Sequence, residues 1–440
     1  MEENAIDLTI REDGVGDILA QAIPYKLGKY EIGEELGRGA NGVVYKGFDP
    51  FVRRDVAIKI GWCDPATEDS KQRQAKLDFF AEAHAAGRLQ HPNIVALYDA
   101  QMEKDLQYIV MEYVRGVTLK EYCRSDNLLP AAKVVECMFK CCLALDLSHS
   151  MGVIHRDIKP GNIMLSEDGE TKLMDFSVAA ITQNKTINSN LLVGSPSYMS
   201  PEQVQRQQVG PQSDLYSLGA VMYHLLTGKR LYASEEIVDI FRSIIKVQPP
   251  RLQDERPDLP PALWNVVDRA LQKDPSKRFE SGKAMAAELA SIHDNLAHVE
   301  HSISQSEQHH ALLKLKFFSR FDTSNLDEIM TVSTLLNFKQ GERISQESDI
   351  GNSFYIVVKG TVRVTQAAQL LVILNRGECF GKTGFTTPGK QGPVLTAESG
   401  VLLLKVNAVG IETLSERTQL QYYRAFSQNL IDRLASSRAS

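Results

Sequence analysis

Residues 155–162 (HRDIKPGN) place a carboxylate, a lysine and an amide close together, as Asp157, Lys159 and Asn162. Another carboxylate, Asp175, follows thirteen residues after Asn162. Carboxylate and amide oxygens are ligands that Mg²⁺ accepts, and a positioned carboxylate can take the proton of a hydroxyl group. These residues therefore predict a site that binds magnesium and receives a hydroxyl proton.

A glycine-rich stretch, GRGANGVV at residues 37–44, is the first candidate for phosphate binding. Glycines let backbone amides approach phosphate oxygens without a side chain in the way. Seventeen residues after Gly42, the apolar run 56–58 delivers Lys59, and Glu82 is a candidate acidic partner. Taken singly, these features also fit a hairpin turn, an ordinary strand lysine and a solvated glutamate.

The same order of motifs continues through residues 200–202 (SPE), Asp214 and Arg278. Residues 30–296, approximately, resemble a eukaryotic-type protein kinase domain, closest in texture to bacterial Ser/Thr kinases. The resemblance implies a bilobal α+β fold that uses ATP and Mg²⁺ to phosphorylate proteins. Lys159, two residues after Asp157, is similar to the Ser/Thr branch of that family and implies protein substrates modified on serine or threonine.

The resemblance also implies a role for each site residue. Asp157 would accept the substrate hydroxyl proton, and Lys159 would steady the γ-phosphate. Lys59 would hold the α- and β-phosphates and pair with Glu82. The implied magnesium ligands are Asn162 and Asp175; the implied ATP contacts are Leu36, Gly37, Arg38, Gly39, Ala40, Asn41, Gly42, Val43, Val44, Ala57, Lys59, Met111, Glu112, Val114 and Met164, with Met111, Glu112 and Val114 in the hinge that reads adenine.

Two positions depart from the family pattern: Ser177 replaces the glycine that usually follows Asp-Phe, and Ser200 replaces the alanine before Pro201, a mild change. Ser195 stands where the family usually has a threonine that contacts the catalytic aspartate and lysine. Arg156 implies a positive pocket for a phosphate on the activation loop, for which we expect Thr182, Thr186 or Ser189. The alternative to an active kinase is a pseudokinase that serves as a signalling scaffold.

A second resemblance begins near residue 312. Residues 339–344 (KQGERI), 354–362 (FYIVVKGTV) and 377–381 (GECFG) resemble a cyclic-nucleotide-binding domain. That family normally binds the ribose with a glutamate and the cyclic phosphate with an arginine. Here these positions fall at Lys382 and at about Gln391, so we expect a degenerate domain that does not bind cAMP or cGMP at physiological levels.

The elements that must position these residues follow from periodicity. Strands are predicted over 30–36, 42–48, 55–60, 94–100 and 106–112, and helices over 70–89, 131–148, 213–227, 234–246, 262–272 and 282–293. Short β-like runs over 335–338, 353–358, 361–365, 370–375 and 401–406 predict a small barrel or jelly roll, and 408–435 a closing helix. We expect an acidic lead-in at 1–28, a kinase domain at 29–297, a polar linker at 298–310 and the second domain at 311–440.

Composition also bears on whether the protein binds nucleic acid or spans a membrane. The net charge of −6 leaves no basic footprint for nucleic acid, and no apolar run is long enough to span a bilayer. We therefore expect a cytoplasmic chain. Cys137, Cys141 and Cys142 fall in one apolar stretch, which predicts buried helix residues rather than a zinc site.

We expect the C-terminal helix to pack on the barrel of its own domain. A homodimer formed through the C-terminal domain is an alternative that the sequence leaves open.

Overall fold

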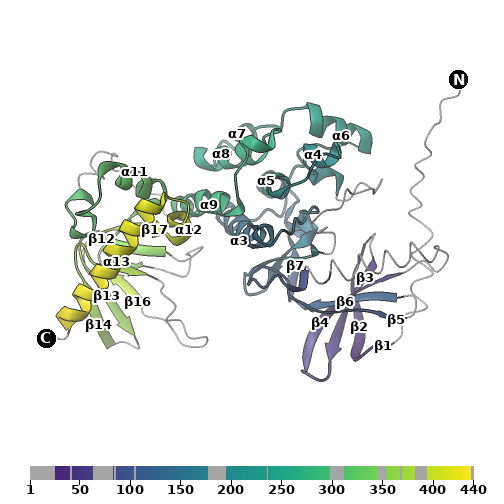
Figure 1. Ribbon diagram of the computed structural model, residues 1–440, viewed down its shortest axis with the longest axis horizontal. Coiled ribbons are helices and arrows are strands. Elements are labelled where there is room, and N and C mark those ends of the chain that lie inside the picture. Colours follow the sequence, from purple (N-terminus) through teal and green to yellow (C-terminus); the bar gives the residue numbers. More distant parts are fainter. Residues whose placement is uncertain are drawn as a thin grey trace. The chain divides into compact units, whose positions relative to one another are not determined.

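A computed structural model describes residues 25–39, 42–62, 83, 86–103, 106–176, 195–234, 236–297, 312–344, 353–366, 369–381 and 394–437 (Figure 1). The chain forms two compact units. The first covers Met1–Gln90 and Val95–Arg115, and the second covers His91–Ile94 and Gly116–Ser440. No helix within the described ranges is both long enough and apolar enough to cross a membrane.

The first unit is built on an antiparallel sheet with the order β1-β2-β3-β4-β6-β5. Its strands are β1 (Lys26–Leu27), β2 (Tyr30–Gly39), β3 (Gly42–Asp49), β4 (Arg54–Trp62), β5 (Leu97–Glu103) and β6 (Leu106–Glu112). Val56, Ile58 and Ile60 of β4 are buried in one apolar cluster. Because side chains alternate along a strand, Ala57 and Lys59 lie on the opposite face.

The second unit begins with a helical part. Its helices are α3 (Ala131–Ser150), α4 (Pro201–Val204), α5 (Pro211–Thr227), α6 (Ile237–Lys246), α7 (Leu252–Glu255), α8 (Pro261–Ala270) and α9 (Gly282–Ala297). A small sheet of β7 (Gly116–Thr118), β8 (Ile163–Ser166) and β9 (Thr171–Leu173) accompanies them. Every residue of α5 from Ser213 onward is buried. Gly219 permits close packing, since a Cβ there would lie 2.7 Å from Cβ of Ala270 on α8.

The predicted buried cysteines lie in the core of α3. Cys137, Cys141 and Cys142 are each at most 1% exposed, and burial raises the pKa of all three thiols. Within the described residues no group of histidine, cysteine and carboxylate side chains could hold a metal ion at zinc-site spacing. These cysteines are packing residues of the helix.

The C-terminal part holds two antiparallel sheets, β10-β17-β12-β15 and β11-β16-β13-β14. Their strands are β10 (Ser333–Phe338), β11 (Arg343–Ile344), β12 (Ser353–Lys359), β13 (Val362–Gln366), β14 (Gln369–Leu374), β15 (Cys379–Gly381), β16 (Val394–Ala397) and β17 (Val401–Asn407). One apolar cluster contains buried side chains of both sheets, among them Tyr355, Leu403, Val362 and Leu395. The predicted α+β class and the sheet-rich second domain are confirmed.

Helices cover this part as well. A second cluster joins Ile356 and Leu404 of the first sheet to Leu326 of α11 (Thr323–Thr331) and Tyr422 of α13 (Glu416–Ser437). The yellow helix α13 runs along the strands of its own domain in Figure 1. The prediction that the terminal helix packs on its own barrel therefore agrees with this structure.

The single helix predicted over 408–435 is wrong. The chain forms α12 (Ala408–Ile411), a turn, and then α13. Asn407 caps α12 by accepting hydrogen bonds from the N–H groups of Val409 and Gly410, and Thr413 ends it by donating to the Gly410 carbonyl. The periodic spacing of apolar residues runs through this turn and therefore predicted one continuous helix. Hydrogen bonds from side chains to the backbone end a helix without changing that spacing.

Candidate active site

Asp157 is the centre of the candidate site. Its carboxylate is only 8% exposed and accepts three hydrogen bonds from groups that lie within the second unit. One oxygen accepts from Lys159 Nζ at 2.6 Å and from Asn162 Nδ2 at 3.1 Å, and the other accepts from the Ser195 backbone N–H at 3.0 Å. The structure thus brings together the three residues predicted from the segment 155–162.

Ser195 joins the site through its backbone. The sequence marked this residue because the family usually has threonine there, with an expected contact to the catalytic aspartate and lysine. The hydrogen bond to Asp157 comes from the backbone N–H of Ser195, which any residue except proline could supply. The replacement of threonine by serine therefore leaves this hydrogen bond intact.

The backbone around Asp157 is fixed by a buried carboxylate on α5. Asp214 accepts hydrogen bonds from the N–H groups of His155 and Arg156, each at 2.8 Å, and from His149 Nε2 at 2.8 Å. Arg156 has a positive φ of 66°, a conformation that a residue with a side chain adopts only when its surroundings enforce it. The two hydrogen bonds to Asp214 hold the backbone in this conformation at Arg156, the residue immediately before Asp157.

Burial raises the pKa of Asp214, but the hydrogen bond and charge of His149 and the nearby His155 outweigh it. The pKa of Asp214 therefore lies below its ordinary value. A carboxyl group whose pKa is lowered by folding stabilises the folded state above its unfolded pKa, about 3.9. That contribution disappears as the pH falls from this value through the lower folded pKa.

Asp214→Asn is expected to destabilise the helical part and to reduce activity, because the amide cannot accept both backbone hydrogen bonds on two charged oxygens. We expect a loss of about 2–3 kcal/mol at pH 7, which shrinks as the pH falls below about 4. Urea unfolding at several pH values measures it. Asp239→Asn on the exposed face of α6 is the control. Equal stability of the two variants at pH 7 would contradict this role for Asp214.

A hairpin brings Asp175 to Asn162. Asn162 directly precedes β8, Asp175 follows β9 by two residues, and the strands pair antiparallel with Ile163 opposite Leu173. The N–H of Met174 donates to the Asn162 carbonyl at 2.9 Å. Strand pairing therefore places the two predicted magnesium ligands at the same end of one hairpin.

His155 supports the segment that carries Asp175. Its Nε2 lies 2.9 Å from the Met174 carbonyl, and its ring lies 4.6 Å from the ring of Phe176. Asp175 itself has a positive φ of 68°. Ser177, the predicted departure next to it, lies outside the described residues, as do Thr182, Thr186 and Ser189.

The side chains present fit a magnesium ion. Asn162 uses its amide nitrogen for two hydrogen bonds to Asp157, at 2.8 Å to the carbonyl and 3.1 Å to the carboxylate. Its side-chain oxygen therefore remains able to accept a hydrogen bond or to bind a metal ion. Together with the carboxylate of Asp175 it offers the oxygen donors that Mg²⁺ prefers.

The first unit carries the predicted phosphate-binding residues. Lys59 stands on β4 opposite Val44 of β3 and Ile109 of β6, on the face away from the apolar cluster. The implied ATP contacts on β2 are Leu36, Gly37, Arg38 and Gly39, at the end of the strand, and those on β3 are Gly42, Val43 and Val44, at its start. The remaining ones are Ala57 on β4, Met111 and Glu112 at the end of β6, and Val114 two residues later. Ala40, Asn41 and Glu82 lie outside the described residues.

Gly42 shows why the loop needs glycine. Its φ is 130°, and a Cβ at this position would stand 2.2 Å from the carbonyl oxygen of Ile60. Only glycine allows β3 to start this close to β4. Of the other implied ATP contacts, Arg38 forms an ion pair with Glu35 at 2.8 Å, and Met164 lies on β8 of the second unit.

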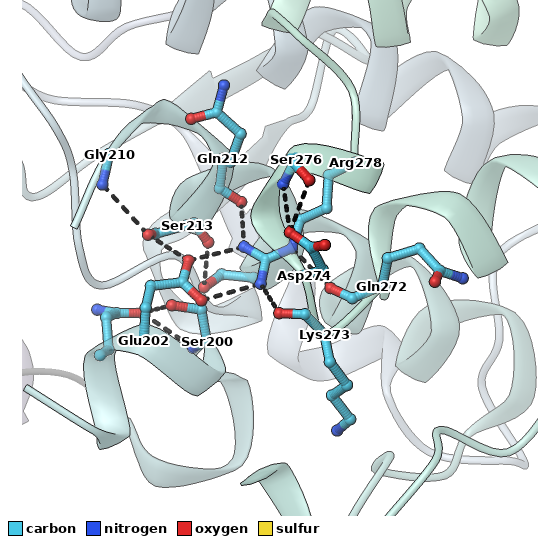
Figure 2. Close-up of polar contacts among 12 residues, drawn as sticks. Ser200, Glu202, Gly210, Gln212, Ser213, Gln272, Lys273, Asp274, Ser276 and Arg278 are labelled. Carbon is cyan, nitrogen blue, oxygen red and sulfur yellow. Dashed lines mark hydrogen bonds and ion pairs between the residues drawn. The ribbon is translucent and has the colours of Figure 1, made fainter. Parts of the chain in front are cut away.

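A buried ion pair braces the helical part of the second unit. Arg278 Nη1 and Nη2 donate to the two carboxylate oxygens of Glu202 at 2.7 and 2.9 Å (Figure 2). The guanidinium also donates to the carbonyls of Gln212, Gln272 and Lys273. All five of its N–H groups are therefore used, which stabilises a charge that is otherwise expensive to bury.

Sequence reasoning missed two supporting residues. His149 contacts Asp214, and Gln203 Nε2 donates to the Arg156 carbonyl at 2.8 Å. His149 lies 65 positions from Asp214, and Gln203 lies 47 positions from Arg156. No local motif marks them, because their roles arise only when α3 and α4 pack beside the segment that holds Asp157.

Comparison with known proteins agrees with this geometry. Residues 30–290 match the model of the protein kinase domain. The chain belongs to the protein kinase family. Residues 335–418 match the model of the cyclic nucleotide-binding domain. The family assignment of both parts is thus confirmed.

Two similar curated proteins come from bacteria. The serine/threonine-protein kinase PknB of Mycolicibacterium smegmatis is 37% identical over 276 residues, which cover 61% of this chain and 44% of the relative. The serine/threonine-protein kinase PrkC of Bacillus subtilis is 36% identical over 268 residues, covering 61% and 41%. The chain thus spans less than half the length of these relatives, and its homology to Ser/Thr kinases is confirmed.

Proposed function

We propose that this kinase family member transfers the γ-phosphate of ATP to serine and threonine hydroxyls of proteins. The observation that supports it most is the carboxylate of Asp157, which is buried and held by three donors. Two carboxylate oxygens offer about four acceptor positions, so one remains for a substrate hydroxyl. A base in this setting is oriented before the substrate arrives.

The neighbouring groups fit phosphate transfer. Lys159 is about one third exposed and sits 2.6 Å from Asp157, where its ammonium group could also contact a transferred phosphate. Asn162 and Asp175 would hold Mg²⁺, which when bound neutralises charge on phosphate oxygens. Lys59 would position the α- and β-phosphates, and Glu82 would orient Lys59.

The test is transfer of labelled γ-phosphate by the full chain to a mixed protein substrate with Mg²⁺, followed by phosphoamino acid analysis. We expect label on serine and threonine. Label on tyrosine would overturn the proposed specificity. Tight ATP binding without any transfer would favour the pseudokinase scaffold instead.

We also propose that residues 29–297 form the catalytic domain, 298–310 a linker, and 311–440 a regulatory domain that does not respond to cAMP or cGMP. The second proposal is supported by the sequence at Lys382 and about Gln391, where the family has glutamate and arginine. Both positions lie outside the described residues. A cation at the ribose position and a neutral amide at the phosphate position remove two charge-assisted contacts.

Isothermal calorimetry of the full chain with cAMP and with cGMP is expected to show no binding at micromolar nucleotide. Each lost contact is worth about 1.5–3 kcal/mol, or about tenfold to a hundredfold in affinity. The double variant Lys382→Glu with Gln391→Arg is expected to bind more tightly than the natural chain. Micromolar affinity of the natural chain for either nucleotide would contradict the proposal.

A further inference from the structure

The segment Ser195–Tyr198 borders the proposed catalytic carboxylate. Its first residue donates its N–H to Asp157 at 3.0 Å, and the next three form the short helix η4 (Pro196–Tyr198). All four residues are partly exposed. A peptide whose hydroxyl reaches Asp157 must therefore pass close to this segment.

The far end of the segment is anchored to α5. The Tyr198 hydroxyl lies 2.8 Å from His224 Nδ1, and the two rings lie 6.1 Å apart. Burial and, to a smaller extent, the charge of Arg230 lower the pKa of His224 to about 4. The imidazole is therefore neutral at pH 7, and His224 adds no charge to the site.

Arg230 is the cation beside this anchor. It follows the left-handed Gly228 that ends α5 and is exposed. Burial raises the pKa of the Tyr198 hydroxyl, and the nearby Arg230 guanidinium opposes that rise. It also acts electrostatically on His224 and on Cys123. Among the described residues, no carboxylate is one of the groups that shift the pKa of Tyr198, His224 or Cys123.

The adjacent lysine shows the contrast. Lys229 Nζ forms an ion pair with Glu255 at 2.7 Å, whereas within the described part of the chain no carboxylate lies within ion-pair distance of Arg230. A guanidinium with its fork of donors is suited to bind a planar carboxylate. The site thus has an exposed positive charge, Arg230, on the side of Tyr198. No carboxylate in the described part of the chain neutralises this charge through an ion pair.

We propose that Arg230 selects protein substrates that carry an acidic residue within a few positions of the phosphorylated serine or threonine. The inference rests on the proposed function, because it names the substrate class of the same site. The carboxylate of the substrate would pair with the Arg230 guanidinium while the acceptor hydroxyl lies at Asp157. Arg230 is a specificity residue in this account and takes no part in phosphate transfer.

A set of peptides with one serine among alanines tests this with the full chain. Glutamate, alanine or lysine is placed at each position from three before to three after the serine, and kcat/KM is measured. We expect at least one position where glutamate raises kcat/KM about tenfold over alanine and lysine lowers it, the size of one charge-assisted contact. No preference for glutamate at any position would overturn the inference.

Variants assign the effect to Arg230. Arg230→Gln should abolish the preference for glutamate while kcat/KM for the alanine peptide stays within about twofold. Arg230→Glu should reverse it in favour of lysine, and the neighbouring control Lys229→Gln should keep the natural preference. A preference that survives Arg230→Gln, or an equal loss on every peptide, would overturn the inference.

The outcomes separate this inference from the proposed function. If the natural chain phosphorylates the alanine peptide without regard to flanking charge, the kinase proposal stands and the role of Arg230 is wrong. If it phosphorylates no peptide and no protein substrate, the kinase proposal fails and the role of Arg230 fails with it.

Discussion

Asp157→Asn is expected to reduce phosphate transfer by about 10²–10⁴-fold, the usual contribution of a positioned general base. Asparagine has nearly the same shape, and its side-chain oxygen can still accept one of the hydrogen bonds now made by Lys159, Asn162 and Ser195. It cannot accept a proton from a substrate hydroxyl. Steady-state phosphorylation of a peptide at saturating ATP measures the effect on kcat.

Two controls give this result its meaning. ATP affinity, measured by calorimetry with the same variant, should change little because the substitution removes a group that acts on the acceptor hydroxyl. Asp168→Asn, in the exposed turn between β8 and β9, should leave kcat unchanged. Retention of more than a tenth of the natural kcat by Asp157→Asn would contradict the assignment of Asp157 as the base.

Arg278→Ala is expected to have the largest effect on stability. The Glu202 carboxylate would stay buried with the Ser213 hydroxyl as its remaining described partner, and three backbone carbonyls would lose a charged donor (Figure 2). Breaking one side of a buried ion pair costs about 3–5 kcal/mol. Amide hydrogen exchange of α5 should accelerate by about two to three orders of magnitude, since each 1.4 kcal/mol is tenfold.

The control is an ion pair of similar length on the surface. Arg242 and Asp239 on α6 lie 2.6 Å apart with both side chains about half exposed. Arg242→Ala should change exchange by less than about fivefold, because exposed pairs contribute at most about 1 kcal/mol. Similar exchange rates in the two variants would show that the network around Glu202 is not the brace described above.

The contribution of Glu202 to the stability of the folded state is expected to depend on pH. Burial raises the pKa of Glu202, but the hydrogen bond and charge of Arg278 and the hydroxyl of Ser213 lower it below its ordinary value. Its contribution to stability is therefore complete above the unfolded pKa, about 4.3, and is lost as the pH falls through the lower folded pKa. Arg278→Ala should be least harmful in acid, where Glu202 is protonated.

The sequence predicted the cluster around Asp157 because its members are close together along the chain. Asp157, Lys159 and Asn162 lie within six positions, and Asp175 is returned to them by one short hairpin. The apolar run 56–58 likewise predicted the strand that carries Lys59. In each case the information lies within a segment short enough for spacing to determine geometry.

The supporting residues could not be predicted in this way. His149, Gln203 and His224 act only through tertiary packing, and their helices show nothing unusual along the chain. The break between α12 and α13 was missed because Asn407 and Thr413 bind the backbone while the apolar spacing runs on. Glu82 and Lys382 stay predictions, because they lie outside the described residues.

The most direct test of the account is transfer of labelled γ-phosphate from ATP by the full natural chain, compared with the Asp157→Asn variant under the same conditions. The account predicts phosphoserine and phosphothreonine with the natural chain and at most about a hundredth as much with the variant. Equal labelling by both proteins, or none by the natural chain when ATP and Mg²⁺ saturate it, would contradict the account.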